Sequence, residues 1–519
     1  PQRFPHGSPG HTELFSDPDL FELLVVLIPA VQNILPDLGK NYELLILVRD
    51  SEKNHALFDE YAHQTGLTIV YGDLLDKPVV KDCVANSDLC LHIAAFVSPF
   101  ADYYPKKAMQ INYGSTRNII ESAKELGKAD TYKFVYIGTV AETGDRMPPI
   151  HWGRVGDPIK PSMFDYYAVS KVASERYVIE SGLKYWVSLR QTGIIGPAMA
   201  KIDDPIQFHN CLYNVLEYVS DRDSGRMMRN LSAYTAEKTL DDSFWGHIYN
   251  IGGGESCRVS TRQMYEMMYR EMGFTTLDTL INPKDYATRN FHGHYYEDSD
   301  KLEEYLHFRK DSMQWYVDAF LEQVGPALGF AKVVNKLPGG QKLMGAIIQS
   351  TFKKNLNAEH GPRYWIKHHQ KDHIEAYWGS KKAWKKLPKK FSDMEEFTDW
   401  DTVIHLDHGY DESKPESELT LKDMKGAAEF RGGKCLSKKM TTGDWTTPLE
   451  FQCAFGHKFH ASPRLVLEGG HWCDECERKS WNYGQRAKVD PFFAQVWTPL
   501  HEPDELREYP KEVSELDVK

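Results

Sequence analysis

The sequence of 519 residues lacks any run of about 20 apolar residues, the length that a membrane-spanning helix needs. Its most apolar stretch, 23–31, is interrupted by Pro29, so we expect no membrane span. The N-terminal PQRFPHGSPGH lacks the apolar region of a signal peptide, which favours a cytoplasmic protein. Positive charge is also in deficit, because 62 Lys and Arg face 74 Asp and Glu, a net charge of −12. This disfavours a nucleic-acid partner, which stays an alternative because the tract 351–391 is basic and interleaved with Trp and Tyr.

Cysteine is scarce for a chain of this length, with eight residues in 519, which excludes a disulfide-rich fold. Four cysteines are scattered through apolar contexts and are expected to be buried thiols: Cys83, Cys90, Cys211 and Cys257. The other four fall within residues 435–476, a clustering that indicates a metal site.

Glycine is missing at one informative position. Residues 21–50 (FELLVVLIPAVQNILPDLGKNYELLILVRD) are typical of a strand, a helix and a second strand, the opening unit of a dinucleotide-binding domain. Such a unit normally has a glycine-rich turn before its helix, and here the turn is Ile28-Pro29-Ala30. We favour the absence of a few glycine-rich residues from the chain near Leu27–Pro29. A shortened turn with other donors, or loss of nucleotide binding, are the alternatives.

Short apolar segments alternate with helical patterns between residues 23 and 195, which predicts an α/β fold with a Rossmann-type, doubly wound parallel sheet. The expected strands are 23–28, 44–48, 67–71, 89–93, 133–138 and 186–190, and two of the helices are 109–127 and 166–182. Further helices are expected at 205–220, 261–273 and 311–328.

We predict five regions along the chain. They are a dinucleotide-binding domain (1–197), a smaller substrate-binding region (198–330), a basic and aromatic helical extension with a polar linker (331–425), a zinc module (426–485) and an acidic tail (486–519).

The segment DYYAVSK places Tyr167 four residues before Lys171. On a helix these positions share one face, so the phenol and the ammonium project into the same space. A nearby ammonium favours the charged form of a phenol, which can then exchange a proton with a substrate oxygen. The pair predicts acid–base chemistry at a carbonyl or an alcohol.

Six ordered segments resemble the extended short-chain dehydrogenase/reductase family, the NAD-dependent epimerase/dehydratase group. The likeness covers about residues 20–330 and consists of GDLLD (72–76), LHIAA (91–95), INYGSTRNI (111–119), FVYIGTVAETG (134–144), SLRQTGIIGP (188–197) and IYNIGGGES (248–256). The resemblance implies that Thr139 and Tyr167 bind the reacting oxygen, and that Lys171 also holds the nicotinamide ribose. It implies a proton-relay role for Asn112, for which a helix-kink residue is an equal alternative.

The same resemblance implies an NAD(P) site. Asp73 would meet the adenine, and the other expected contacts are Leu74, Ala94, Ala95, Gln191 and Ile194. The second strand ends in Arg49 and Asp50. Arginine accepts the 2′-phosphate of NADP and an acidic residue takes the ribose hydroxyls of NAD, so Arg49 favours NADP and Asp50 leaves NAD as the alternative.

Sugar-nucleotide dehydratases of this family carry an Asp-Glu pair after the hydroxyl residue, where this chain has Val140 and Ala141. We therefore expect an alcohol–carbonyl oxidoreductase. The aromatic and proline-rich segments 95–105 and 145–165 should border an apolar or ring-bearing substrate. An epimerase or an acyl-thioester reductase are alternatives within the family, and a nucleotide-sensing protein that engages a partner through its zinc module is a rival of another class.

The segment FQCAFGHKFHASPRLVLEGGHWCDEC supplies three thiols and an imidazole at a spacing typical of structural zinc: Cys453, His457, Cys473 and Cys476. With GGKCLS at 432–437 it resembles small zinc-ribbon or treble-clef domains. We expect Cys435 to be a buried thiol, and His460 is the alternative to His457.

The helices at 109–127 and 166–182 carry more apolar residues than the sheet needs. In the resembled family these helices pair across a two-fold axis, so we expect a homodimer.

Overall fold

The computed structural model describes residues 27–40 and 42–513 of the chain. The predicted first strand, 23–28, lies outside these residues apart from its last two positions. Those two are not extended: Leu27 already has helical backbone angles, and helix α2 (Ile28–Ile34) follows at once, with Pro29 in its first turn. Proline is favoured in a first helical turn, because its missing N–H is not needed there.

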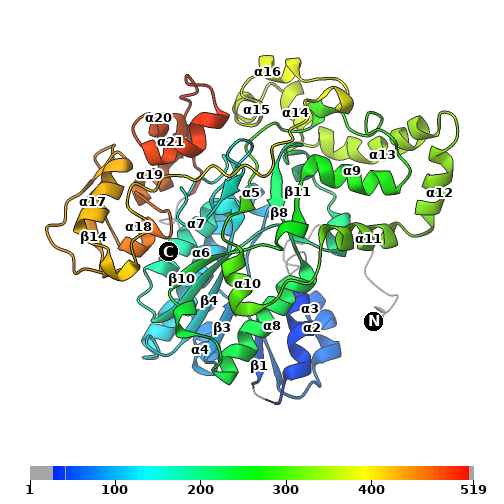
Figure 1. Ribbon diagram of the computed structural model, residues 1–519. Helices are drawn as coiled ribbons and strands as arrows, with labels where there is room; N and C mark the ends of the chain where they lie inside the picture. Colours follow the sequence, from blue (N-terminus) through cyan, green and yellow to red (C-terminus); the bar gives the residue numbers. More distant parts are fainter. Residues whose placement is uncertain (1–26, 41, 514–519) are drawn as a thin grey trace.

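Six parallel strands form the centre of the fold (Figure 1). Five of them confirm the other strand predictions closely: β1 (Leu44–Val48), β2 (Leu67–Tyr71), β3 (Leu89–His92), β4 (Lys133–Thr139) and β6 (Tyr185–Gln191). The sixth is β10 (His247–Ile251), at the segment 248–256 that carries part of the family resemblance. Four are ordered β10-β6-β4-β3, and β1 pairs with β2. Within the described residues no hydrogen-bonded strand joins the two groups. The arrangement is a Rossmann-like α/β fold.

Helices cover both faces of the four-stranded group. They are α4 (Lys77–Ala85), α6 (Pro105–Glu125) and α7 (Tyr166–Ile179) on one face, and α2, α8 (Asp221–Glu237) and α10 (Asp300–Leu306) on the other. Because successive strand residues point to opposite faces, Phe134 and Tyr136 pack under the first set, while Val135 and Ile137 pack under the second. Two shorter helices, α3 (Glu52–Phe58) and α5 (Phe100–Tyr103), follow β1 and β3.

The next region, up to residue 357, contains short strands and four further helices besides α8 and α10. Its elements are β7 (Ile194–Ile195), β8 (Val215–Glu217), β9 (Val219–Ser220), β11 (Arg258–Ser260), β12 (Tyr295–Tyr296, paired with β5, Trp152–Gly153), α9 (Thr261–Glu271), α11 (Met313–Val324), α12 (Pro326–Asn335) and α13 (Gly340–Asn357). The helix predicted at 205–220 is wrong: Pro205–Phe208 form only a 3-10 helix, and the Val- and Tyr-containing NVLEYVS suits a strand, so β8 pairs with β11 there.

The C-terminal third is folded throughout residues 362–510. Its elements are α14 (Pro362–Lys367), α15 (Lys371–Trp378), α16 (Lys381–Lys386), α17 (Leu421–Phe430), β13 (Lys434–Cys435), β14 (Leu449–Gln452), β15 (Lys458–Ala461), α18 (Pro463–Leu467), α19 (Asp474–Lys479), β16 (Ser480–Trp481), α20 (Tyr483–Ala487), α21 (Pro491–Trp497) and β17 (Tyr509–Pro510). No helix in the described residues has the length and hydropathy to cross a bilayer.

These C-terminal elements pack on α7. The core around Val178 and Ile179 continues into Leu465, Val466 and Trp472 of the predicted metal-binding region. The acidic tail is therefore not a free tail, since Phe492 and Phe493 of α21 are fully buried. The polar linker 409–425 ends in α17, which Thr420 and Asp423 start with a capping box.

Candidate active site

Thr139 lies at the carboxyl end of β4, directly before the short 3-10 helix η4 (Val140–Glu142). Its hydroxyl oxygen accepts a hydrogen bond from the backbone N–H of Ala141 at 3.2 Å, and its own N–H donates to Oε1 of Glu142 at 3.1 Å. This reciprocal capping box fixes the side chain. Because the hydroxyl oxygen already accepts a bond, its proton can be donated to a substrate oxygen.

Helix α7 begins at Tyr166, where two half-buried carboxylates receive its first free N–H groups. Asp165 accepts from the N–H of Ala168 at 2.8 Å, and Asp102 accepts from those of Tyr166 and Tyr167 at 2.8 and 3.4 Å. These acceptors satisfy donors that have no partner inside the helix. Burial, with the neighbouring Asp165 carboxylate, raises the pKa of Asp102 well above its ordinary value. The start of α7, which carries Tyr167, is therefore fixed from outside the helix.

Lys171 follows Tyr167 by four residues on α7, and its side chain is buried against β4. Its Nζ donates to the carbonyl of Ile137 at 2.5 Å and lies 4.4 Å from the ring centroid of Tyr136. The hydroxyl of Tyr136 donates in turn to the Lys171 carbonyl at 3.1 Å. The ammonium is thus bonded to β4 two residues before Thr139, on the helix that carries Tyr167.

Asn112 of α6 joins α6, the end of β3 and α7. Its Oδ1 accepts from the N–H of Phe96 at 2.6 Å, and its Nδ2 donates to the Phe96 carbonyl at 3.1 Å and to Oγ of Ser170 at 2.8 Å. Ser170 donates onward to the carbonyl of Tyr167 at 2.7 Å. The proton-relay role stays a prediction, and these contacts show Asn112 as a support of the Tyr167 backbone.

The residues predicted for the adenosine end of a cofactor lie where β1 and β2 end. Arg49 and Asp50 follow β1 and are exposed, and Asp50 pairs with His55 at 2.8 Å. Asp73 follows β2, is exposed, and accepts from the N–H of Leu75 at 2.8 Å, with Leu74 beside it. The carboxyl ends of parallel strands share one edge, where ligands bind in such sheets.

The residues predicted for the nicotinamide end gather at the same edge. Ala94 and Ala95 follow β3 directly, and Gln191 ends β6 opposite Thr139 in the strand register. Ile194 pairs with Val219 in the strands that follow. The small side chains after β3 leave space for a nicotinamide riboside. The Thr139 hydroxyl and the buried Lys171 ammonium are hydrogen-bond donors that suit it.

The described residues offer few backbone N–H donors for the pyrophosphate at the centre of a dinucleotide. In α2, Pro29 has no N–H to give a pyrophosphate, and a Cβ at Gly225 of α8 would come within 2.6 Å of the Pro29 carbonyl oxygen. Helix α8 therefore lies directly on the first turn of α2. No glycine-rich turn is present in the described stretch from Leu27 to Ile34, while residues 23–26 lie outside it.

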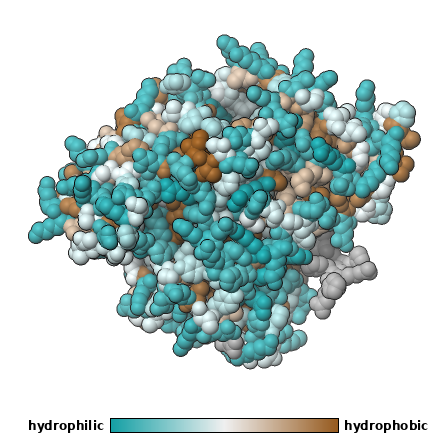
Figure 2. Space-filling view, viewed as in Figure 1, coloured by the Kyte–Doolittle hydropathy of each residue, from teal (hydrophilic) through white to brown (hydrophobic). Residues whose placement is uncertain are grey.

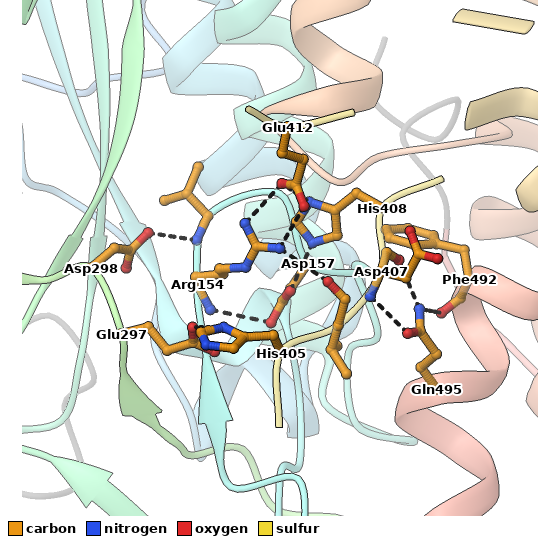
Figure 3. Close-up of polar contacts among 12 residues, drawn as sticks. Arg154, Asp157, Glu297, Asp298, His405, Asp407, His408, Glu412, Phe492 and Gln495 are labelled. Carbon is orange, nitrogen blue, oxygen red and sulfur yellow. Dashed lines mark hydrogen bonds and ion pairs between the residues drawn. The ribbon is translucent and has the colours of Figure 1, made fainter. Parts of the chain in front are cut away.

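The segment 145–165, predicted to border the substrate, is instead buried under C-terminal elements. Figure 3 shows Arg154 beside Glu412, with both guanidinium nitrogens 2.8 Å from its carboxylate, and Asp157 beside His408 at 3.0 Å. The hydroxyl of Tyr483 donates to the carbonyl of Pro161 at 2.7 Å. The segment is therefore a contact surface for the C-terminal third, because its polar groups pair with residues of that region. The other segment, 95–105, does reach the site, since Phe96 and Phe100 pack with Tyr167.

The four predicted metal ligands converge. Their ligand atoms all lie within 4.8 Å of one another, with Cys453 Sγ 3.7 Å from Cys476 Sγ and His457 Nδ1 3.2 to 3.6 Å from the three sulfurs. Tetrahedral zinc with Zn–S bonds of 2.3 Å would separate two sulfurs by about 3.8 Å. The set therefore fits zinc.

The two other residues weighed for the metal site lie elsewhere. His460 is exposed on β15, opposite Glu450 of β14. Cys435 packs against the core from β13.

A buried polar network behind the site had no sequence signal. Glu175 of α7 accepts from Arg190 of β6 at 2.7 and 3.0 Å and pairs with His471 at 3.0 Å. Arg190 also lies 3.6 Å from Glu142. Only the position of His471, directly before the WCDEC segment, hints at a role in the sequence.

Comparison with known proteins supports the N-terminal half of the interpretation. Residues 33–215 match the model of the NAD dependent epimerase/dehydratase family. Human 3 beta-hydroxysteroid dehydrogenase type 7 is 29% identical over 140 residues, which is 25% of this chain and 37% of that protein. The chain thus matches little more than a third of the length of this relative.

Solved structures with similar folds cover a larger share of the chain. WbmH of Bordetella bronchiseptica with NAD+ is 18% identical over 57% of this chain and 95% of its own, with a TM-score of 0.41. DesIV of Streptomyces venezuelae, a dTDP-glucose 4,6-dehydratase with NAD bound, is 19% identical over 59% and 94%, with a TM-score of 0.43. The family match at 33–215 covers about a third of the chain and shows that this part is similar to the NAD dependent epimerase/dehydratase family.

Proposed function

We propose that the protein is an NAD(P)-dependent oxidoreductase that interconverts an alcohol and a carbonyl on an apolar or ring-bearing small molecule. One observation carries the proposal. Tyr167 and Lys171 lie one turn apart on α7, and Lys171 is bonded to β4 two residues before Thr139. A phenol, an ammonium and a free hydroxyl proton are thereby collected at the carboxyl edge of the sheet.

Each of these groups has a chemical task. The hydroxyl groups of Thr139 and Tyr167 hydrogen-bond the substrate oxygen, and Tyr167 passes a proton to it or takes one from it. The Lys171 ammonium stabilises the phenolate form of Tyr167. Asn112 and Asp102 hold the backbone of Tyr167 in place. A bound nicotinamide supplies or accepts hydride at the substrate carbon.

The residues for the cofactor are those at the strand ends. Arg49 would accept the 2′-phosphate of NADP, which we favour, and Asp50 would take the ribose hydroxyls if NAD is used. The remaining residues are proposed for the adenine and the nicotinamide riboside: Asp73, Leu74, Ala94, Ala95, Lys171, Gln191 and Ile194.

The substrate class rests on the surroundings of Tyr167. Phe96, Phe100 and Ile111 pack beside it, which suits an apolar substrate. Glu142, the acidic residue closest after Thr139, is fully buried and bonded to the Thr139 backbone, so it is not free for dehydration chemistry. The name of the human relative, a hydroxysteroid dehydrogenase, supports the same class. The family description supports an epimerase as the alternative.

We propose a structural zinc ion at Cys453, His457, Cys473 and Cys476, because all four ligand positions are filled by protein. The region around it packs on α7, which favours a role in completing the enzyme over docking a partner. A cytoplasmic location and a homodimer remain proposals. Val169 and Val172 of α7, which suggested the dimer, are buried within this chain.

The test combines cofactor binding with turnover. NADPH and NADH binding to the zinc-loaded chain would be measured by calorimetry, and turnover with a panel of hydroxysteroids, sugar nucleotides and acyl thioesters. We expect Tyr167→Phe to bind cofactor within about a few-fold of wild type and to lose turnover, because it lacks only the proton donor.

Tyr166→Phe is the matched control, since the hydroxyl of Tyr166 faces the N–H of Glu512 and not the site. It should keep turnover. Normal turnover in Tyr167→Phe would refute the assigned role, and failure of the wild type to bind either nucleotide would refute the proposed function.

A further inference from the structure

Helices α12 and α13 form a hairpin at one edge of the molecule, at the right of Figure 1. Of the ten large apolar side chains that are exposed in the described residues, five lie on this hairpin or its turn. They are 48 to 63% exposed: Phe330, Val333, Leu337, Leu343 and Ile347. Figure 2 shows hydrophobic side chains at the same edge of the surface.

The spacing of these residues puts them on one side of the hairpin. Phe330, Val333 and Leu337 follow one another at intervals of three and four residues, and Leu343 and Ile347 at an interval of four. Side chains at such intervals share a helix face. The exposed residues therefore form an apolar outer face.

A separate, inner face attaches the hairpin to the protein. Ala331, Met344 and Leu356 lie in the core shared with α9 and α11. A Cβ at Gly345 would come within 2.5 Å of the Thr279 carbonyl oxygen, so α13 lies directly on the backbone there. The outer face is not needed for this packing, and a helix that is apolar on two sides is expected to have a second apolar contact.

The hairpin is positively charged, whereas the chain as a whole is negatively charged. Residues 326–357 contain five lysines and no acidic residue, in a chain whose net charge is −12. Lys332 and Lys354 pair with Glu271 and Asp203. Lys336 and Lys342 flank the turn beside Leu337 and Leu343, and no acidic side chain of the described residues lies within ion-pair distance of them.

We infer that the outer face of this hairpin binds the surface of an anionic lipid bilayer. The apolar side chains would enter the boundary between headgroups and acyl chains, and Lys336 and Lys342 would contact the lipid phosphates and carboxylates. Exposed apolar residues flanked by lysines are the pattern that interfacial helices use. The inner face keeps the hairpin fixed to the domain, so the hairpin would lie along the bilayer surface.

A second copy of the chain fits this face poorly. In a two-fold contact the same patch meets itself, so the lysines at the turn would face the lysines of the other copy. The hairpin has no acidic residue that could pair with them. The negative charge of the bilayer matches these lysines instead.

The test uses co-sedimentation of the full, zinc-loaded chain with two kinds of vesicle, phosphatidylcholine alone and phosphatidylcholine mixed with phosphatidylserine. We expect binding to the mixed vesicles that weakens as salt is added. Lys336→Ser/Lys342→Ser should weaken it by roughly ten- to thirty-fold, and Val333→Ser/Leu337→Ser/Leu343→Ser should abolish it.

The control is Leu75→Ser/Ile404→Ser, which removes two similarly exposed apolar side chains elsewhere on the surface and should bind as the wild type does. Failure of the wild type to sediment with mixed vesicles would overturn the inference. Equal binding of the wild type and the triple variant would overturn it too. If the triple variant instead converts a dimer to a monomer in analytical ultracentrifugation while vesicles sediment neither form, the face is an interface between copies.

Discussion

Nε2 of His471 lies 3.0 Å from Oε2 of Glu175, and both side chains are fully buried. His471 stands two residues before the proposed metal ligand Cys473, and Glu175 stands one turn after Lys171 on α7. This contact therefore joins the metal-binding region to the helix that carries the proposed proton donor.

The contact extends toward Thr139 through an arginine. Arg190 donates to Glu175 and to the carbonyl of Gly469, and it lies 3.6 Å from Glu142, which bonds the N–H of Thr139. Burial alone would raise the pKa of Glu175, but Arg190 holds that pKa well below its ordinary value. Burial and the Glu175 carboxylate raise the pKa of Glu142. One ionised carboxylate thus neutralises the buried arginine.

Glu175→Gln should lower the free energy of unfolding by about 3–5 kcal/mol, because it leaves the Arg190 charge buried without a counter-ion. Urea denaturation followed by fluorescence measures this. The control is Glu125→Gln on the surface of α6, which removes exposed ion pairs to Lys77 and Lys81 and should leave the midpoint unchanged. A wild-type midpoint for Glu175→Gln would show that Arg190 is stabilised by other groups.

Asp102→Ala should reduce kcat and lower stability by about 1–2 kcal/mol, because two N–H groups in the first turn of α7 lose their acceptor. Asp102→Asn keeps a side-chain oxygen that can accept from both N–H groups, so it should restore both values. Steady-state kinetics and thermal unfolding measure the two effects. Equal damage in both variants would mean that the volume and not the acceptor matters.

The strands and the proposed catalytic residues were predictable because their signals are local. An apolar run bounded by polar turns marks each of the strands β1, β2, β3, β4 and β6, and the spacing of Tyr167 and Lys171 is a property of one helix. The role of Thr139 was implied by the resemblance of its segment, 134–144, to the family. The predicted first strand, 23–28, lies outside the described residues apart from Leu27 and Ile28.

The role of the C-terminal third could not be predicted, because its contacts join residues about 300 positions apart. His471 reaches Glu175, and Tyr483 reaches Pro161, with no pattern in the sequence that links them. From the sequence alone, the additional apolar residues on α7 predict a homodimer contact. In the structure Val169 and Val178 are buried within the chain itself. The homodimer stays a prediction, but the apolar residues of α7 no longer support it.

Metal removal should unfold the C-terminal region and the Rossmann-like domain in one transition. The two share a core, in which Trp472 and Leu465 contact Val178 and Ile179, so loss of the metal exposes α7. We expect one zinc per chain by elemental analysis, and loss of both zinc and turnover in Cys473→Ser/Cys476→Ser.

Cys435→Ser is the control for this experiment, because Cys435 lies in the same region but outside the ligand cluster. It should keep zinc. Full zinc retention in the double variant would refute the site, and two separate thermal transitions after chelation would refute the shared core.

Stability should fall as the pH rises above neutrality, because of His408. Its side chain lies between Asp157 at 3.0 Å and Glu412 at 2.8 Å, with Arg154 also facing it (Figure 3). Burial lowers the pKa of His408, but the two carboxylates outweigh burial and raise it above its ordinary value. A group whose pKa is raised by folding stabilises fully below its unfolded pKa, about 6.5, and loses that contribution as the pH passes its folded pKa.

The two carboxylates act in a different pH range. Although burial raises the pKa of each, Arg146 holds the pKa of Asp157 at about 2 and His408 holds that of Glu412 at about 2, so their contributions are lost only in acid. Between about pH 6 and about pH 9 the wild type should therefore lose more unfolding free energy than His408→Gln, measured by urea denaturation at each pH. His405→Gln, an exposed neighbour on the same segment, should follow the wild type. Parallel curves for the wild type and His408→Gln would show that His408 does not change its protonation in this range.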